Sequence, residues 1–195
     1  MTVDELPDIV YHGTMSVHKE SLIAGIDINK GYTSTDFGQG FYTTGNYEQA
    51  VHIAKGRAKE YNKRHKSNDG AYPMVISYSV NKGLLADYRG LIFEDPNDKW
   101  KEFVYNNRVG NDFAVSNYHN FSKKYDYVYG FVADSYITKM VRNIRNGSMT
   151  FGELSDLLKP LKADLYDQLS FHSQGAISVL TMNNIEVLDK EVELV

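Results

Sequence analysis

The sequence contains no cysteine, which excludes disulfide bonds, thiolate metal sites and a cysteine nucleophile. No apolar run approaches the ~20 residues that a membrane-spanning helix needs, and the opening stretch, MTVDELPD, lacks the basic and apolar parts of a secretory signal. We therefore expect a cytoplasmic protein with no membrane partner. The net charge is only −4 at pH 7, so no large basic field indicates binding to duplex nucleic acid.

The composition is that of a folded protein. Hydrophobic residues make up 42% of the chain and charged residues 24%, close to the usual values for soluble globular proteins. The length of 195 residues fits one domain, residues 1–195. The 15 tyrosines and 9 phenylalanines allow two interpretations: half-buried strands around a β-rich core, or surfaces on which a flat ligand stacks.

The order of the hydrophobic patterns predicts an α+β fold. Asn46 is a suitable N-cap for a helix over residues 47–61, because apolar and aromatic residues recur there at helical spacing. Trp100 is expected in the core. In full, strands are expected over 9–11, 41–44, 74–80, 125–132 and 165–172, helices over 16–21, 47–61, 99–108, 135–146, 151–158 and 174–181, and a β-like tail from 185 to 194.

A glycine-spaced segment, residues 31–54, carries the strongest functional signal. Gly38 and Gly40 allow the backbone to turn sharply and to approach a ligand closely. Tyr42 and Tyr47 follow and offer flat faces for stacking. The segment lacks the strand, GxGxxG and helix order of a dinucleotide fingerprint and the Lys-Ser/Thr of a phosphate loop.

His12 lies upstream, where a short apolar run ends. A histidine in this position can be structural or functional. Gly13 follows directly, and a glycine there leaves backbone N–H and C=O groups open, as needed to hold a carboxamide by two hydrogen bonds. Together the two segments indicate a nucleotide site.

The combination of Tyr-His-Gly-Thr at 11–14 with Gly-x-Gly-Phe-Tyr-Thr-Thr at 38–44 resembles the histidine–tyrosine class of ADP-ribosyltransferases, which includes diphtheria-type toxins and the poly-ADP-ribose polymerases. The resemblance implies a split two-sheet core with flanking helices that binds NAD between the sheets. It also implies roles for single residues: His12 and Gly13 would hold NAD, Tyr42 and Tyr47 would stack on the nicotinamide, and Thr14, Gly40 and Phe41 would complete the binding site.

The chain is also similar, over nearly its full length, to a bacterial family of uncharacterised function placed in this superfamily. The matching segments are YHGT at 11–14, DFGQGFYTT at 36–44, WKEFVYNNR at 100–108, YDYVYGFVAD at 125–134 and QLSFHS at 168–173. This resemblance implies transfer of ADP-ribose from NAD to an unidentified protein or nucleic acid, with release of nicotinamide and without a metal. By analogy it also implies a bacterial toxin or phage-defence setting, with a small neutralising partner.

One position departs from that pattern. Gln168 stands where the superfamily has a glutamate, and a glutamine can hydrogen-bond a ribose but cannot act as a base. Asp134, Asp167 and His172 are alternative catalytic groups, with His172 on the same strand face as Gln168. Arg108 could contact the NAD pyrophosphate or pair with an acid of the fold. An NAD glycohydrolase, a non-catalytic nucleotide-binding module and a peptide-binding domain therefore remain alternatives to the transferase.

Overall fold

The computed structural model describes residues 1–65 and 70–189, and it contains two β-sheets. The first is antiparallel, with the order β1 (Ile9–Met15), β3 (Pro73–Val80), β7 (Leu180–Val187). The second has the order β2 (Phe41–Thr43), β6 (Asp167–Phe171), β5 (Tyr127–Phe131), β4 (Gly90–Ile92). Only the β4–β5 pair of the second sheet is parallel. The expected α+β class is confirmed.

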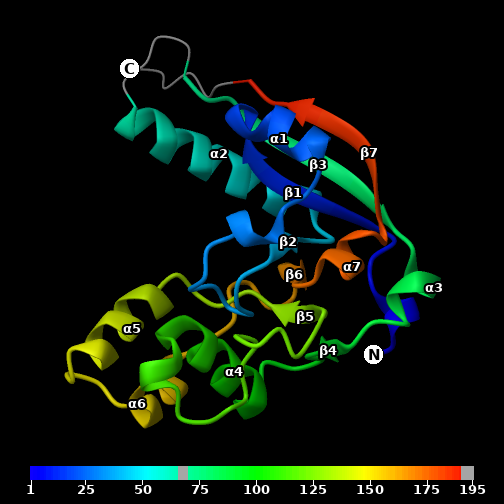
Figure 1. The fold of residues 1–195 in the computed structure, drawn as a ribbon. Coiled ribbons are helices and arrows are strands. Elements are labelled where there is room, and N and C mark those ends of the chain that lie inside the picture. The colour runs from blue at the N-terminus through cyan, green and yellow to red at the C-terminus, as the bar shows by residue number, and fades with distance from the viewer. Residues whose placement is uncertain (66–69, 190–195) are drawn as a thin grey trace.

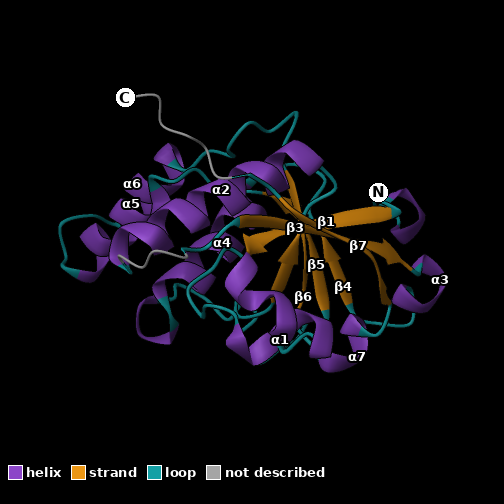
Figure 2. Cartoon of the chain, turned by 90° about the horizontal axis from the view of Figure 1, so that it is seen from above, coloured by secondary structure: helices purple, strands orange, loops and turns teal. Residues whose placement is uncertain are grey.

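Helices cover the two sheets separately. The long helix α2 (Tyr47–Arg64) lies against β1 and β3, whereas α4 (Asp98–Val109), α5 (Ile137–Arg145) and α6 (Phe151–Leu157) gather beside the second sheet (Figure 1). Seen from above, the strands collect on one side of the molecule and α4, α5 and α6 on the other (Figure 2). The remaining elements are short: α1 (Lys19–Ala24), α3 (Lys82–Leu85), α7 (Gln174–Ile177), and the 3-10 turns Val3–Glu5, Ser16–His18, Ile28–Lys30 and Asn111–Phe113. No helix of residues 1–65 and 70–189 is long and apolar enough to cross a membrane.

Among the described residues one backbone bridge links the two sheets, between Tyr11 of β1 and Thr44, the residue that follows β2. The N–H of Tyr11 donates to the carbonyl of Thr44 at 2.8 Å, and the N–H of Thr44 donates back at 3.0 Å. The side chain of Thr44 donates to the Asp167 carboxylate at 2.6 Å, which ties the bridge to β6. Beyond Tyr11 the outer edge of β1 is not part of a β ladder, and this free edge carries His12 and Gly13.

Side chains of the second sheet alternate between two cores. Phe41 and Phe171 lie opposite each other and pack into the core between the sheets, with Val10, Ile76 and Tyr78. Their neighbours along β2 and β6 point the other way because successive side chains of a strand alternate. Those neighbours face the core beneath α4 and α5, which contains Phe37, Trp100, Phe103, Val128 and Ile137.

Most predicted elements are confirmed, and the last predicted helix is present but shorter than expected. The Asn46 side chain accepts the N–H of Gln49 at 2.9 Å, which starts α2 as expected, and Trp100 is fully buried. The helix predicted over 174–181 ends at Ile177, because the chain pairs with β3 from Leu180 onward. The predicted tail is β7 as far as Val187, and its residues 190–194 lie outside the described residues.

The Tyr78 hydroxyl is buried in the core between the two sheets, where it has no hydrogen-bond partner among the described residues. A buried polar group without a partner costs about 1–3 kcal/mol. We therefore expect Tyr78→Phe to raise the free energy of unfolding by about 1 kcal/mol, measured by urea denaturation. Tyr105→Phe is the matched control, because it removes a hydroxyl that donates to the Phe113 carbonyl at 3.0 Å and should destabilise. A destabilised Tyr78→Phe variant would show that the hydroxyl does have a partner.

Candidate functional site

His12 is the centre of the candidate site. Its ring is half-buried and stacks on Phe41, with ring centroids 4.4 Å apart and an interplanar angle of 28°. Its Nδ1 lies 2.7 Å from the Tyr42 carbonyl oxygen. A carbonyl oxygen only accepts, so Nδ1 carries the proton and donates. The two contacts fix the plane and the rotation of the imidazole.

The His12 ring is neutral, and its second nitrogen is an acceptor. Burial, assisted by the nearby Arg57 charge, lowers the pKa of His12 to about 3. With the proton on Nδ1, the lone pair is on Nε2. Nε2 has no hydrogen-bond partner within the part of the chain that the structure describes. It can therefore accept a hydrogen bond from a ligand hydroxyl over the whole physiological pH range.

Gly13 brings helix α2 close to the free edge of β1. A Cβ at this position would lie 2.1 Å from the Ala50 carbonyl oxygen, so only glycine permits the packing. The Gly13 carbonyl accepts a hydrogen bond from Arg57 Nη1 at 2.9 Å. In an antiparallel strand both backbone groups of one residue point to the same side, so the Gly13 N–H also faces this edge. We call His12, Gly13, Phe41 and Arg57 the His12 cluster.

Further basic groups surround the His12 cluster. His18 ends the 3-10 turn that follows β1, and its pKa is lowered by burial and by the charges of Arg57 and Lys30. Tyr32 is 82% exposed and interacts electrostatically with Arg57. Arg57 itself is solvent-exposed, yet desolvation by the surrounding protein lowers its pKa. The surroundings of His12 are therefore positively charged.

Tyr42 does not lie with the His12 side chain, contrary to the prediction. It points to the opposite face of β2 from Phe41 and packs against the core beneath α4. Its hydroxyl donates to the Gly38 carbonyl at 2.7 Å, accepts the Phe37 N–H at 3.0 Å, and lies 2.8 Å from the Thr35 hydroxyl. Tyr42 thus anchors the glycine-containing loop, and the aromatic ring next to His12 belongs to Phe41.

Gln168 and Arg108 belong to a buried network centred on Asp36, which is only 2% exposed. Arg108 Nε donates to Asp36 Oδ1 at 2.7 Å, and Nη2 lies 2.6 Å from the same oxygen. Gln168 Nε2 donates to Asp36 Oδ2 at 2.9 Å and to the Phe131 carbonyl at 2.8 Å. The Gln168 amide nitrogen and the Arg108 guanidinium are thus bound within the fold, and the roles of Gln168 at the ribose and Arg108 at the pyrophosphate stay predictions.

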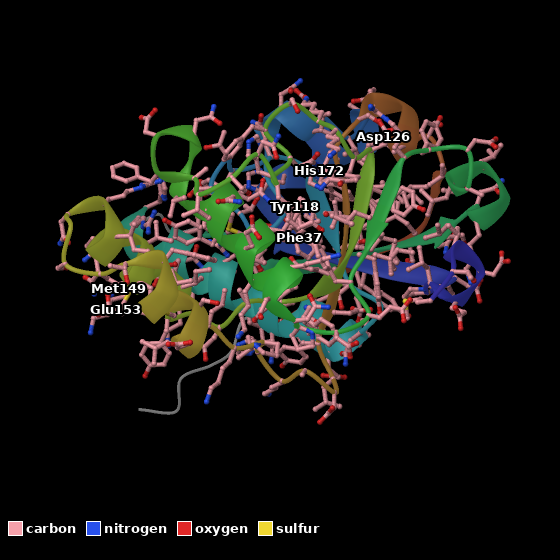
Figure 3. The ribbon with its side chains drawn as sticks, turned by 90° about the horizontal axis from the view of Figure 1, so that it is seen from below. Phe37, Tyr118, Asp126, Met149, Glu153 and His172 are labelled. Atoms are coloured by element: carbon pink, nitrogen blue, oxygen red, sulfur yellow. The ribbon has the colours of Figure 1, made fainter. Side chains whose placement is uncertain are left out.

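His172 is also a structural residue. It is fully buried, and burial lowers its pKa to about 4. Its Nδ1 donates to the Gln39 carbonyl at 2.9 Å, and its Nε2 lies 2.8 Å from the Ser170 hydroxyl. Figure 3 shows His172 and Phe37 toward the middle of the molecule, whereas Met149 and Glu153 lie at its far end. A Cβ on Gly40 would meet the His172 ring at 2.6 Å, so His172 supports the loop rather than a ligand.

The evolutionary family covers all of these residues. A family model described as "Protein of unknown function (DUF3990)" matches residues 9–182. The chain belongs to the DUF3990 family. No curated protein and no solved structure matches it. The matched residues run from the start of β1 into β7, so both the His12 cluster and the Asp36 network lie within the DUF3990 region.

The other predicted residues of this DUF3990 chain are spread over the fold. Tyr47 packs against Tyr11 with ring centroids 5.5 Å apart, and its hydroxyl donates to Glu186 at 2.8 Å. Because Tyr11 and His12 point to opposite faces of β1, Tyr47 does not share a face with His12. Thr14 is buried on the His12 face. Asp134 accepts the Tyr136 N–H at 2.8 Å and so caps a turn.

Asp167 lies at a separate cavity of about 400 Å³. The cavity is lined by residues that include Gly45, Asn46, Tyr129, Phe131, Leu165 and Asp167. Asp167 accepts the Gly45 N–H at 2.8 Å and the Tyr129 hydroxyl at 3.2 Å. Of the predicted site residues only Asp167 lines this cavity, and it is bound to groups of the fold. No group of three or more potential metal ligands occurs in residues 1–65 and 70–189.

Arg57 is the functional candidate that the sequence analysis missed. The buried stripe of α2 contains Ala50, Ala54 and Ala58, which face β1. Arg57 follows Ala54 by three residues and so lies beside this stripe on the helix. That spacing could have placed Arg57 at the free edge of β1. No comparable sequence pattern shows which of Phe41 and Tyr42 faces His12, because strand alternation alone does not say which face of β2 meets His12.

Proposed function

We propose that this DUF3990 chain binds NAD at the His12 cluster and transfers ADP-ribose to a macromolecule in the cytoplasm. The observation that carries the proposal is the fixed, neutral imidazole of His12, whose Nε2 is left as an acceptor. An acceptor of this kind suits a ribose hydroxyl. The Gly13 N–H, on the free edge of β1, suits the carboxamide oxygen of nicotinamide. Two separate sheets, linked among the described residues by one backbone bridge at Tyr11 and Thr44, agree with the ADP-ribosyltransferase-like core that the sequence motifs imply.

The reaction needs no redox step. The bond between ribose C1′ and the nicotinamide nitrogen breaks, and its electron pair leaves with nicotinamide, which departs as a neutral molecule. A nucleophile of the acceptor then bonds to C1′ and gives its proton to solvent. The protein's part is to hold the ribose and the leaving group in a reactive geometry, a contribution that can be large without any catalytic base.

A non-catalytic NAD-binding module is the second candidate, and the Asp36 network favours it. Both amide hydrogens of Gln168 are used within the fold, so its amide nitrogen does not donate to a ribose. A transferase built on the His12 cluster would depend on an acceptor that supplies its own strong nucleophile. A small neutralising partner protein belongs to the transferase proposal only, because a passive binding module needs no inhibitor.

The test is incubation of the purified protein with NAD that is labelled on its adenylate part, in a bacterial lysate. We expect free nicotinamide together with label on protein or nucleic acid. Nicotinamide without a labelled macromolecule would instead identify an NAD glycohydrolase. Binding of NAD without nicotinamide release would leave the binding module as the function. If NAD neither reacts nor raises the melting temperature, the NAD proposal fails.

His12→Ala should weaken NAD binding at least about 10-fold, the loss expected for one ligand hydrogen bond and the ring contact. Titration calorimetry measures the change, and thermal unfolding checks that the variant is folded. His52→Ala is the matched control, because His52 lies exposed on α2, and we expect its NAD affinity to equal that of the wild type. If His12→Ala and His52→Ala bind NAD with equal affinity, His12 does not contact NAD.

A further inference from the structure

Arg57 has no acidic partner among residues 1–65 and 70–189, and it lies beside His12 on the free edge of β1. Arg108 pairs with Asp36, Arg89 with Asp126 and Arg64 with Glu60. For Arg57, in contrast, the described residues provide one hydrogen-bond partner, the Gly13 carbonyl, which Nη1 contacts at 2.9 Å. A guanidinium has five N–H donors in a planar fork. Its Nε and Nη2 donors are therefore available to a ligand on the exposed side of α2.

The groups around Arg57 are basic, and among them His18 is neutral at pH 7 because its pKa is lowered. His18 and Lys30 interact electrostatically with each other, and His18 interacts with Arg57. Lys30 Nζ donates to the neutral hydroxyl of Ser21 at 2.9 Å. A nearby carboxylate would raise the pKa of a basic group, and none is among the groups that shift the pKa of Arg57 or of His18. Arg57 and Lys30 are therefore two cations near His18 without a counter-charge, and the neutral imidazole of His18 adds an N–H donor, so these groups would attract an anion.

We propose that Arg57, His18 and Lys30 form an anion subsite next to His12, and that this subsite takes the diphosphate group of a nucleotide. Phosphate oxygens suit the remaining guanidinium fork, which can bind two of them at once. The diphosphate of a dinucleotide adjoins its ribose, as the subsite adjoins His12. The identity of the nucleotide as NAD rests on the proposed function, whereas the anion subsite does not.

The test is titration calorimetry of the full chain with inorganic pyrophosphate, ADP, adenosine and NAD. We expect pyrophosphate and ADP to bind and adenosine to bind much more weakly than ADP. Arg57→Ala should lower the affinity for pyrophosphate and for NAD at least about 10-fold, as the loss of a bidentate charged contact predicts. Arg64→Ala is the matched control, because Arg64 lies on the same helix, is exposed and pairs with Glu60; it should change neither affinity.

Two further variants keep the test decisive. Lys30→Ala removes a second cation from an exposed position and should also lower the affinity for pyrophosphate. Arg57→Lys should keep part of the affinity that Arg57→Ala loses, through its charge alone. Pyrophosphate affinity should fall as salt is raised, because salt screens the exposed charges. Pyrophosphate binding that is equal in the wild type and in Arg57→Ala, or no pyrophosphate binding at all, would overturn the anion subsite.

The anion subsite and the NAD proposal can fail separately. If NAD binds in a manner that depends on His12 while Arg57→Ala has no effect, the anion subsite is overturned and the proposed function stands. If pyrophosphate and ADP depend on Arg57 while NAD binds no better than ADP and releases no nicotinamide, the subsite stands. In that case the chain binds a nucleoside diphosphate and the ADP-ribosyltransferase proposal fails.

Discussion

Asp36→Ala is expected to lower the free energy of unfolding by about 3–5 kcal/mol, the usual cost of removing one partner from a buried ion pair. Asp36 is 2% exposed and receives hydrogen bonds from Arg108, Gln168 and the Ala133 N–H. Its removal leaves these donors without a partner. The Arg108 side chain is 24% exposed, so water can reach it in part, and we expect the lower end of the range.

Urea denaturation at pH 7 measures this effect. Asp112→Ala is the matched control, because Asp112 is exposed, and a surface substitution of this kind changes stability by at most about 0.5 kcal/mol. The slope of the unfolding free energy against urea should stay equal among the three proteins, which would show that the variants unfold from the same compact state. A loss below about 1 kcal/mol for Asp36→Ala would contradict a network that holds the glycine-containing loop to α4 and β6.

Gln168→Glu is expected to lower the free energy of unfolding by roughly 3 kcal/mol, because buried groups that lose a hydrogen-bond partner cost about 1–3 kcal/mol each. The amide nitrogen donates to the Asp36 carboxylate and to the Phe131 carbonyl. A glutamate would place an acceptor against both of these acceptors and a second negative charge beside Asp36. The defect should shrink at mildly acidic pH, since the new carboxyl group regains a donor when it is protonated.

The same variant separates the structural from the catalytic role of Gln168. Restoring the glutamate of the ADP-ribosyltransferase pattern would raise turnover if this side chain reached the ribose. Because the structure buries Gln168 on the face of β6 opposite to Phe171, we expect no gain in nicotinamide release. Gln174→Glu, at an exposed position, controls for the added charge. A stable Gln168→Glu variant with faster nicotinamide release would contradict the Asp36 network.

Local signals predicted much of the fold. Helix α2 follows from the Asn46 cap and the helical spacing of its buried alanines, and both are properties of one short segment. The helix predicted over 174–181 stops early, at Ile177, for a non-local reason: pairing of Leu180 with Val80 on β3 extends the chain there. Hydrogen bonds to a distant strand override the local pattern, and no short window of sequence contains them.

The candidate site could be predicted only in part. The His12-Gly13 pair was found because its chemistry lies in adjacent residues. The Asp36 network was not predicted, since Asp36 and Gln168 are 132 positions apart and buried charge pairs leave no periodic pattern. Tyr42 was placed wrongly for a simpler reason. A one-residue change in strand facing exchanges Phe41 for Tyr42 at His12, and only the packed sheets decide between them.

The most direct measurement is nitrogen-15 NMR of the His12 ring at pH 7, recorded with and without NAD. We expect a neutral imidazole with its proton on Nδ1, as the hydrogen bond to the Tyr42 carbonyl requires. We also expect the Nε2 resonance to shift saturably as NAD is added, while the resonances of the exposed His52 stay constant. A His12 ring with its proton on Nε2, or an Nε2 resonance that millimolar NAD leaves unchanged, would contradict NAD binding at the His12 cluster.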